Sequence, residues 1–374
     1  MKQEALESIA RLREEIASLD KQILGLVARR LAVAEQIGHH KKQAGLPVRN
    51  FKAEVEVLER ARVSCAELGL DPDVGQALLN VLIEAAVGRQ HDLAEKPHDG
   101  PHQSVLVVGG CGRMGDWLCH FFTAHGHRVT VYDSGPQTCE YPRAASLSDA
   151  ARAADVIVLA VPITETAAIL ETLVEARPRG LIFDICSLKS PVLERLHHAV
   201  REGLNVASVH PMFAPDTVLL SGRVLVVCDC GNPAAAEAAR AMFEDTALRI
   251  VEIPLDQHDE YMAYVLGLSH AVNIAFARAL ATSGHGVHDL DRVTSTTFAR
   301  QSHTTRQVAS ENPRLYYEIQ RHNAHTASVL KRLTQAVTDL EAAALSDSSE
   351  AFVALMQTNR RYFEGLDTPP EESA

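Results

Sequence analysis

One stretch decides how this chain folds: VLVVGGCGRMG, from Val105 to Gly115. Its first four residues, Val105–Val108, are apolar and mostly β-branched, as in a buried strand. Closely spaced glycines follow, and Gly110, Gly112 and Gly115 fit the pattern G-x-G-x-x-G. In that pattern the first glycine permits a tight turn, the second lets a ligand approach the backbone, and the third packs helix against strand. The stretch therefore predicts a strand, a phosphate-binding turn and a helix.

The residues that follow support this prediction. An amphipathic segment runs from Trp117 to Phe122, and Arg128–Asp133 has the pattern of a second strand that ends in an acid, about twenty residues on. The pyrophosphate of a dinucleotide is expected at the N-terminus of the helix, where unpaired N–H groups and the helix dipole favour an anion. Asp133 is expected to accept hydrogen bonds from the adenosine ribose, and no basic residue directly follows it to hold a 2′-phosphate. We therefore predict NAD in preference to NADP.

The composition limits the function classes. At 374 residues the chain is long enough for two or three cores. A formal net charge of −12 argues against nucleic acid or an anionic membrane as a partner. No apolar run reaches membrane-spanning length, and Met1–Glu15 is too charged for a signal peptide. Seven cysteines without C-x-x-C spacing favour reduced thiols in a cytoplasmic protein, and we expect no metal site.

The N-terminal region has a helical pattern. Apolar residues recur at steps of three and four from Ile9 to Ile37, which predicts a long helix with a coiled-coil-like seam. Arg30 falls on this seam, where a guanidinium calls for an anion, and Lys41 lies further along nearly the same face. Arg13 lies roughly 25 Å from Arg30 at about 1.5 Å per residue, so only an antiparallel helix of a second copy brings the two together. The alternative is a plain helical dimerisation module with solvated basic residues.

Two further amphipathic helices are expected at about 51–65 and 71–92. With them, residues 5–92 resemble the all-helical chorismate mutases that are fused to enzymes of aromatic amino-acid synthesis. The residues that carry the resemblance are Leu12-Arg13, Leu19-Asp20, Arg30, Lys41, Pro47-Val48-Arg49, Glu54 and Gln90.

The resemblance implies a role for each basic and polar residue of this set. Arg13 of the partner subunit, Arg30 and Lys41 hold the two carboxylates of chorismate. Lys41 and Gln90 face the breaking ether oxygen, and Glu54 faces the ring hydroxyl. The resemblance thus implies a mutase site shared between two subunits.

A polar segment rich in proline and glycine, Glu95–His102, predicts a domain boundary. Beyond Asp133, short apolar runs alternate with helical patterns, which predicts a largely parallel sheet covered on both faces. The runs are 155–162, 181–185, 206–211 and 224–228. Ligands of such sheets bind at the carboxyl ends of the strands, and those ends carry Pro162, Ser187–Lys189 and His210. From Leu255 onward the pattern is helical.

Residues from about 104 to 365 resemble the prephenate dehydrogenases. The segments that carry this resemblance are Val107–Gly115, Ala160–Ile163, Ser187–Lys189, His210–Phe213 and His258-Asp259. Taken as a whole, the chain resembles the bifunctional chorismate mutase/prephenate dehydrogenases, whose first reaction makes the substrate of the second. The resemblance implies a multidomain chain. We expect an all-α mutase-like domain at 1–95, an α/β Rossmann-type NAD-binding domain at 103–253, an α-helical dimerisation domain at 254–367 and a disordered tail at 368–374.

The dehydrogenase resemblance also implies site residues. Neutral His210 accepts a hydrogen bond from the 4-hydroxyl of prephenate and takes its proton, while Ser187 orients the imidazole. Lys189, His270 and an arginine, Arg306 in preference to Arg300, steer the carboxylates of the substrate. The residues expected to hold NAD are Gly110, Gly112, Arg113, Met114, Gly115, Asp133 and Pro162.

Two alternatives stay open at this point. The dehydrogenase could prefer arogenate, which carries an ammonium in place of the keto group. The mutase-like domain could be a non-catalytic dimerisation or effector module, because the chain has Ala53 where the family usually has arginine and Asn50 where aspartate is common. The resemblance further implies a homodimer and feedback inhibition by tyrosine.

Overall fold

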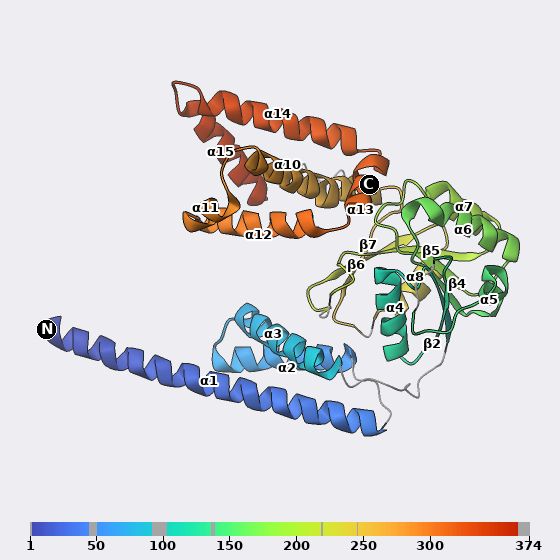
Figure 1. Ribbon diagram of the computed structural model, residues 1–374, viewed down its shortest axis with the longest axis horizontal. Coiled ribbons are helices and arrows are strands. Elements are labelled where there is room, and N and C mark those ends of the chain that lie inside the picture. The colour runs from blue at the N-terminus through green and yellow to red at the C-terminus, as the bar shows by residue number, and fades with distance from the viewer. Residues whose placement is uncertain are drawn as a thin grey trace. The chain divides into compact units, whose positions relative to one another are not determined.

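The computed structural model describes residues 2–44, 51–91, 103–135, 139–217, 220–244 and 246–365. It divides into two compact units, Met1–Leu255 and Asp256–Ala374 (Figure 1). The first unit holds the N-terminal helices and a sheet with its covering helices, and the second is helical. The predicted order of an all-α region, an α/β region and a second all-α region is confirmed.

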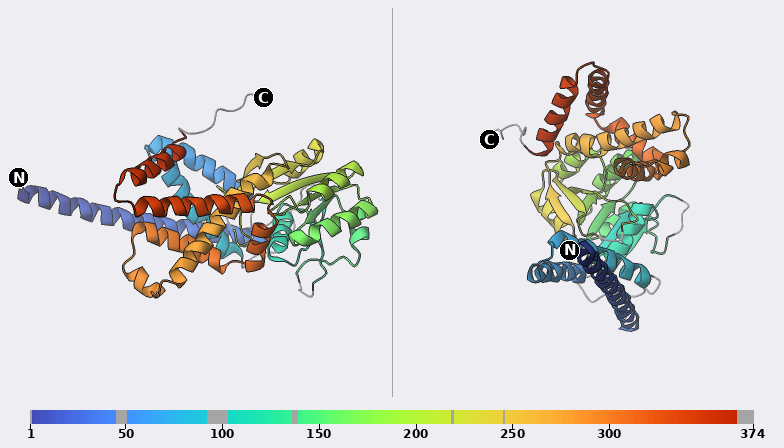
Figure 2. Two further views of the ribbon diagram at one scale, coloured as in Figure 1. Left: turned by 90° about the horizontal axis from the view of Figure 1, so that it is seen from above. Right: turned by 90° about the vertical axis from the view of Figure 1, so that its left-hand side faces the viewer.

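The described residues of the N-terminal region form three helices, as predicted: α1 (Lys2–Ala44), α2 (Phe51–Leu68) and α3 (Pro72–His91). α3 packs against both α1 and α2. The N-terminal half of α1 projects beyond the other two helices (Figure 1, Figure 2). Its apolar seam residues are 45% to 58% exposed, so an apolar row remains open along it: Ile9, Leu12, Ile16, Leu19 and Ile23.

The α/β region is built on a seven-stranded sheet of order β2-β1-β3-β4-β5-β6-β7. The strands are β1 (Ser104–Val108), β2 (Arg128–Tyr132), β3 (Val156–Leu159), β4 (Leu181–Asp184), β5 (Asn205–Pro211), β6 (Val224–Asp229) and β7 (Arg249–Glu252). All neighbours pair in parallel except β5 and β6, which are antiparallel. Six strands match the predicted apolar runs. β7 escaped prediction because it has only four residues and a charge at each end.

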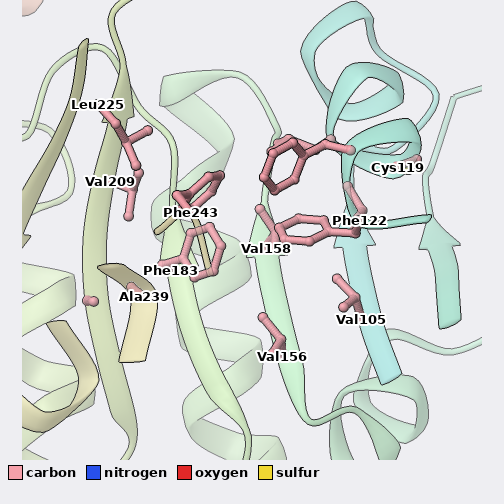
Figure 3. Packing of buried hydrophobic residues seen from close by; sticks show 14 of the residues in the cluster. Val105, Cys119, Phe122, Val156, Val158, Phe183, Val209, Leu225, Ala239 and Phe243 are labelled. Atoms are coloured by element: carbon pink, nitrogen blue, oxygen red, sulfur yellow. The ribbon is translucent and has the colours of Figure 1, made fainter. Parts of the chain in front are cut away.

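Between 103 and 255, the described residues add five helices to the strands: α4 (Arg113–Ala124), α5 (Leu147–Ala153), α6 (Ile163–Ala176), α7 (Leu193–Arg201) and α8 (Pro233–Ala241). On one face of the sheet, aromatic rings hold α4 and the end of α8 in place (Figure 3). Phe243 lies with its ring centroid 6.2 Å from that of Phe122 on α4 and 6.2 Å from that of Phe183 on β4. This packing fixes the position of α4, and with it the glycine turn from which α4 starts.

The second unit consists of helices joined by short turns. They are α9 (His258–Met262), the π-helix η1 (Ala263–Leu268), α10 (Ser269–Ala281), α11 (Val287–Arg292), α12 (Thr296–Ser310), α13 (Pro313–His322), α14 (Thr326–Ala344) and α15 (Glu350–Phe363). α9, η1 and α10 follow one another without a break, so His258–Ala281 is one helical stretch with a wider π segment inside it.

This stretch corrects one expectation. By length and composition alone, with a mean hydropathy of 1.2, it is long and apolar enough to cross a membrane. It was overlooked because polar residues interrupt its apolar runs. Two of those polar residues have partners inside the unit: Nδ1 of His258 lies 2.8 Å from the Asp259 carboxylate, and the Asn273 side-chain oxygen accepts a hydrogen bond of 2.7 Å from Thr305. The contacts of Asn273 tie the stretch to α12 within the second unit.

Candidate active sites

The glycine turn follows β1 as predicted, and three of its glycines are required by the protein itself. Gly109 has φ +85, and a Cβ there would lie 2.5 Å from the carbonyl oxygen of Ala160. A Cβ on Gly110 would lie 2.5 Å from a methyl group of Val131. A Cβ on Gly115 would overlap the carbonyl oxygen of Gly109. Gly109 lies outside the G-x-G-x-x-G pattern and was missed. An additional glycine beside that pattern was a visible signal for a residue with positive φ.

Gly112 differs from the other three glycines. It has φ −80, and a Cβ there would meet only the Gly109 carbonyl oxygen, at 3.3 Å. The protein could accommodate that contact with a small shift, so the fold alone does not explain this glycine. Gly112 is also the N-cap of α4, and no side chain caps the helix. The N-terminus of α4 is where the pyrophosphate of the dinucleotide is expected.

Asp133 ties the end of β2 to this turn. One carboxylate oxygen accepts the Cys111 N–H at 3.0 Å, and the other accepts the Gly135 N–H at 2.8 Å. Arg143 is a basic residue that does not directly follow Asp133 in sequence but lies close to it in the structure. Its guanidinium donates to the backbone oxygens of Asp133 and Gly135. The guanidinium is held on backbone oxygens and braces the loop around Asp133.

The other predicted dehydrogenase residues of this unit lie at the carboxyl ends of β3, β4 and β5. Pro162 is the N-cap of α6, three residues after the end of β3. Ser187 is half-buried, three residues after the end of β4. His210 is the second-last residue of β5 and is 3% exposed. The structure therefore brings Ser187 and His210 to the ends of two strands that pair directly.

Lys189 is enclosed by the protein. Its ammonium nitrogen lies 2.8 Å from the Asp184 carboxylate and donates to the carbonyl oxygen of Val209 at 2.9 Å. The side chains of the pair are 1% and 0% exposed. Burial by itself lowers the pKa of Lys189, but the carboxylate of Asp184 and the neighbouring cysteines together more than offset this, and the pKa lies above its ordinary value. The ammonium is engaged internally, which differs from the substrate contact expected for Lys189.

In the second unit, His270 stacks on Tyr316 with ring centroids 4.1 Å apart. Its Nδ1 is buried without a hydrogen-bond partner among the described residues, and burial lowers its pKa, so the imidazole is neutral near pH 7. Arg306 makes two contacts, of 2.8 and 2.9 Å, with the carboxylate of Asp291. Arg300 is exposed on the same helix, α12.

The N-terminal helices place the predicted mutase residues as follows. Arg30 is half-buried and donates to the carbonyl oxygen of Leu82 on α3 at 2.9 Å, and burial lowers its pKa. Lys41 is half-buried on the same helix, and Arg13 is exposed on its projecting half. The remaining residues cannot be compared, since the side chains of Ala53, Glu54 and Gln90, and Asn50 as a whole, lie outside the described residues.

The comparisons with known proteins agree with this division of the chain. Residues 12–91 match chorismate mutase type II, residues 121–252 the nucleotide-binding domain of prephenate dehydrogenase, and residues 254–358 its dimerization domain. The chain is 26% identical over 353 residues to the T-protein of Enterobacter agglomerans, covering 94% of this chain and 92% of the relative. It is 24% identical over 362 residues to the T-protein of Haemophilus influenzae, covering 96% and 93%.

Among solved structures, prephenate dehydrogenase from A. aeolicus in complex with hydroxyphenyl propionate and NAD+ is similar in fold. The TM-score is 0.58 at 17% identity, and the alignment covers 72% of this chain and 100% of that one. Two of the three family matches are to the two domains of prephenate dehydrogenase, and the third precedes them. The chain therefore belongs to the prephenate dehydrogenase family and carries a type II chorismate mutase domain ahead of the dehydrogenase.

Proposed function

We propose that this protein is a cytoplasmic bifunctional enzyme of tyrosine biosynthesis. It rearranges chorismate to prephenate and then converts prephenate to 4-hydroxyphenylpyruvate with NAD. One observation carries the proposal: a mutase-type helical region and a dehydrogenase with a glycine turn and a strand-end histidine occur in one chain. We assign the mutase to residues 1–95, nucleotide binding to 103–253, and dimerisation and substrate binding to 254–367.

The residues around the glycine turn fit a dinucleotide. Gly112 leaves room where the pyrophosphate backbone would approach, α4 has no side-chain cap, and the Asp133 carboxylate lies beside the turn. When bound, NAD supplies the acceptor for the hydride that leaves the substrate ring, and loss of carbon dioxide then aromatises that ring. The residues assigned to NAD are Gly110, Gly112, Arg113, Met114, Gly115, Asp133 and Pro162.

In the dehydrogenase reaction His210 handles the proton. Its neutral imidazole accepts a hydrogen bond from the 4-hydroxyl of prephenate and takes the proton as the carbonyl forms. Ser187 orients the imidazole. His270 and Arg306 bind the anionic groups of the substrate. Because Arg306 already pairs with Asp291, a substrate carboxylate would have to compete with that pair, and Arg300 remains the alternative on the same helix.

The mutase reaction is a pericyclic rearrangement and needs no nucleophile. Catalysis comes from holding a compact conformer and stabilising charge on the ether oxygen. We assign these tasks to Arg30, Lys41, Glu54 and Gln90 of one subunit and to Arg13 of the partner subunit. The open apolar row on α1 supports the pairing of two copies, because a second α1 would cover it. The active form is thus a homodimer.

A mixing experiment tests the shared mutase site. Arg13→Ala and Arg30→Ala chains are each expected to be inactive as mutases, since each removes a cation that holds a carboxylate. Mixed in equal amounts and allowed to exchange, half of the dimers contain one chain of each kind, and each such dimer has one complete site. We expect recovery of about a quarter of the wild-type mutase rate. Absence of recovery despite demonstrated subunit exchange contradicts a site shared between subunits.

The full function is tested with the intact chain, chorismate and NAD. We expect prephenate to form first and 4-hydroxyphenylpyruvate to follow with an equal amount of NADH. With arogenate as the substrate, NAD reduction should be much slower than with prephenate. Added tyrosine should slow the dehydrogenase. Faster oxidation of arogenate supports the alternative enzyme, and a chain that oxidises prephenate but leaves chorismate untouched supports a non-catalytic N-terminal module.

A further inference from the structure

The buried pair of Lys189 and Asp184 lies where β4 and β5 end. The last residues that pair between these strands are Asp184 and Ser208, so Val209 lies one residue beyond the reach of β4. The carbonyl oxygen of Val209 accepts its hydrogen bond from the Lys189 ammonium, at 2.9 Å. Lys189 thus extends the connection between the two strands past the end of β4, up to the residue that precedes His210.

The same pair also contacts the segment that leads to Ser187. The carboxylate oxygen of Asp184 that meets Lys189 accepts the backbone N–H of Cys186 as well, at 2.9 Å. A continuous set of hydrogen bonds therefore runs from the residue before Ser187, through Asp184 and Lys189, to the residue before His210. The predicted base and the residue that orients it are connected through one buried ion pair.

A direct contact between Lys189 and substrate disagrees with this geometry. The Lys189 side chain is 1% exposed, and its ammonium has a carboxylate and a carbonyl within hydrogen-bond distance. A buried ion pair generally contributes little net stability over an apolar pair of the same shape, because desolvation of both charges opposes their attraction. A role in placing neighbouring groups explains this pair better than a role in stability alone.

We propose that Lys189 is a positioning residue for the dehydrogenase reaction: with Asp184 it holds the backbone on either side of the site so that Ser187 and His210 face the substrate correctly. This inference rests on the proposed function, because it takes His210 as the group that accepts the proton. A misplacement of about 1 Å in such a group costs about 100-fold in rate. The loss falls on the chemical step and leaves substrate affinity nearly unchanged.

The test uses the full-length Asp184→Asn/Lys189→Met variant. Lys189→Met alone leaves a buried carboxylate unpaired and is expected to unfold more easily, whereas the double variant removes both charges and should keep its melting temperature close to that of the wild type. The double variant still lacks the hydrogen bond to Val209. We expect its kcat for prephenate to fall about 10–100-fold, with a KM within about threefold of wild type. Mutase activity in the same sample reports that the chain is intact.

A kinetic isotope effect separates misplacement from a smaller active fraction. With prephenate deuterated at the ring carbon that bears the hydroxyl, a slower hydride transfer increases the isotope effect on kcat, whereas partial unfolding leaves it unchanged. Arg177→Met is the matched control, since it removes an exposed ion pair with Glu202 in the same unit and should alter neither kcat nor the isotope effect.

Three outcomes overturn the proposal. A folded double variant with wild-type kcat makes the pair dispensable, and a lower kcat without a larger isotope effect reduces its role to stability. A KM for prephenate raised tenfold or more at unchanged kcat makes Lys189 a substrate contact. Failure of the proposed function is distinguishable, because then the wild-type protein would not oxidise prephenate, or His210→Asn would oxidise it at the wild-type rate.

Discussion

His210→Asn is expected to lower the dehydrogenase rate by about 10²–10⁴-fold, the usual contribution of a positioned general base. Asparagine is polar and fits the space of the imidazole, but it cannot take the proton of the 4-hydroxyl. Binding of NAD and of prephenate should change little, because His210 contributes to neither the glycine turn nor the cationic groups. The measurement is kcat with prephenate at saturating NAD, with NAD affinity determined separately by fluorescence.

The pH dependence gives an independent reading of the same variant. Protonated His210 cannot accept a proton, so the wild-type rate should rise with pH as the imidazole loses its charge, and the variant should lack this rise. Mutase activity should survive, because Arg30 and Lys41 lie on α1. Turnover close to wild type with the same rise at increasing pH would make His210 a structural residue of β5.

Gly115→Ala is expected to lower both stability and NAD affinity, whereas Gly112→Ala is expected to lower NAD affinity alone. A Cβ at Gly115 collides with the backbone of Gly109 and lies 2.8 Å from Cα of Gly110, so the turn must open and α4 must shift. Overpacking of this type costs about 1–3 kcal/mol of folding free energy. Because the displaced backbone is also the part proposed to hold the pyrophosphate, NAD affinity should fall by about 10–100-fold. Both the melting temperature and the NAD dissociation constant should therefore change.

Gly112→Ala meets only one backbone oxygen, at 3.3 Å, and keeps an ordinary negative φ. We expect a melting temperature close to wild type together with weaker NAD binding, because the new methyl group occupies the side from which the ligand approaches. Equal loss of stability in the two variants would show that Gly112 serves the fold. Unchanged NAD binding in Gly112→Ala would remove this residue from the cofactor site.

Much of this architecture could be predicted because its signals are local in sequence. β-Branched runs such as Val105–Val108 form strands wherever helices cover both faces, and the glycine spacing of the turn reflects contacts among adjacent residues. β7 could not be found in this way, because Arg249 and Glu252 leave it only two apolar residues. Its place in the sheet comes from pairing with β6.

The contacts of individual charged residues were harder to predict from the sequence. Asp184 lies within the predicted run 181–185, and nothing in the sequence shows that Lys189 folds back onto it. The pairing of Arg306 with Asp291 likewise depends on how α11 and α12 meet. Residue type and spacing therefore predicted the fold, while the partner of each charge was set by tertiary packing.

The order of the strands has a consequence for how the chain folds during synthesis. β1 pairs with β3, whose last residue, Leu159, follows Val108 by 51 positions. At translation rates of about 5–20 residues per second, β1 waits about 3–10 s for that neighbour. The helices α1–α3 precede β1 in the chain and are synthesised before it. Until β3 is synthesised, one apolar edge of β1 is therefore unpaired on the nascent chain. In this interval the chain is most exposed to misassociation.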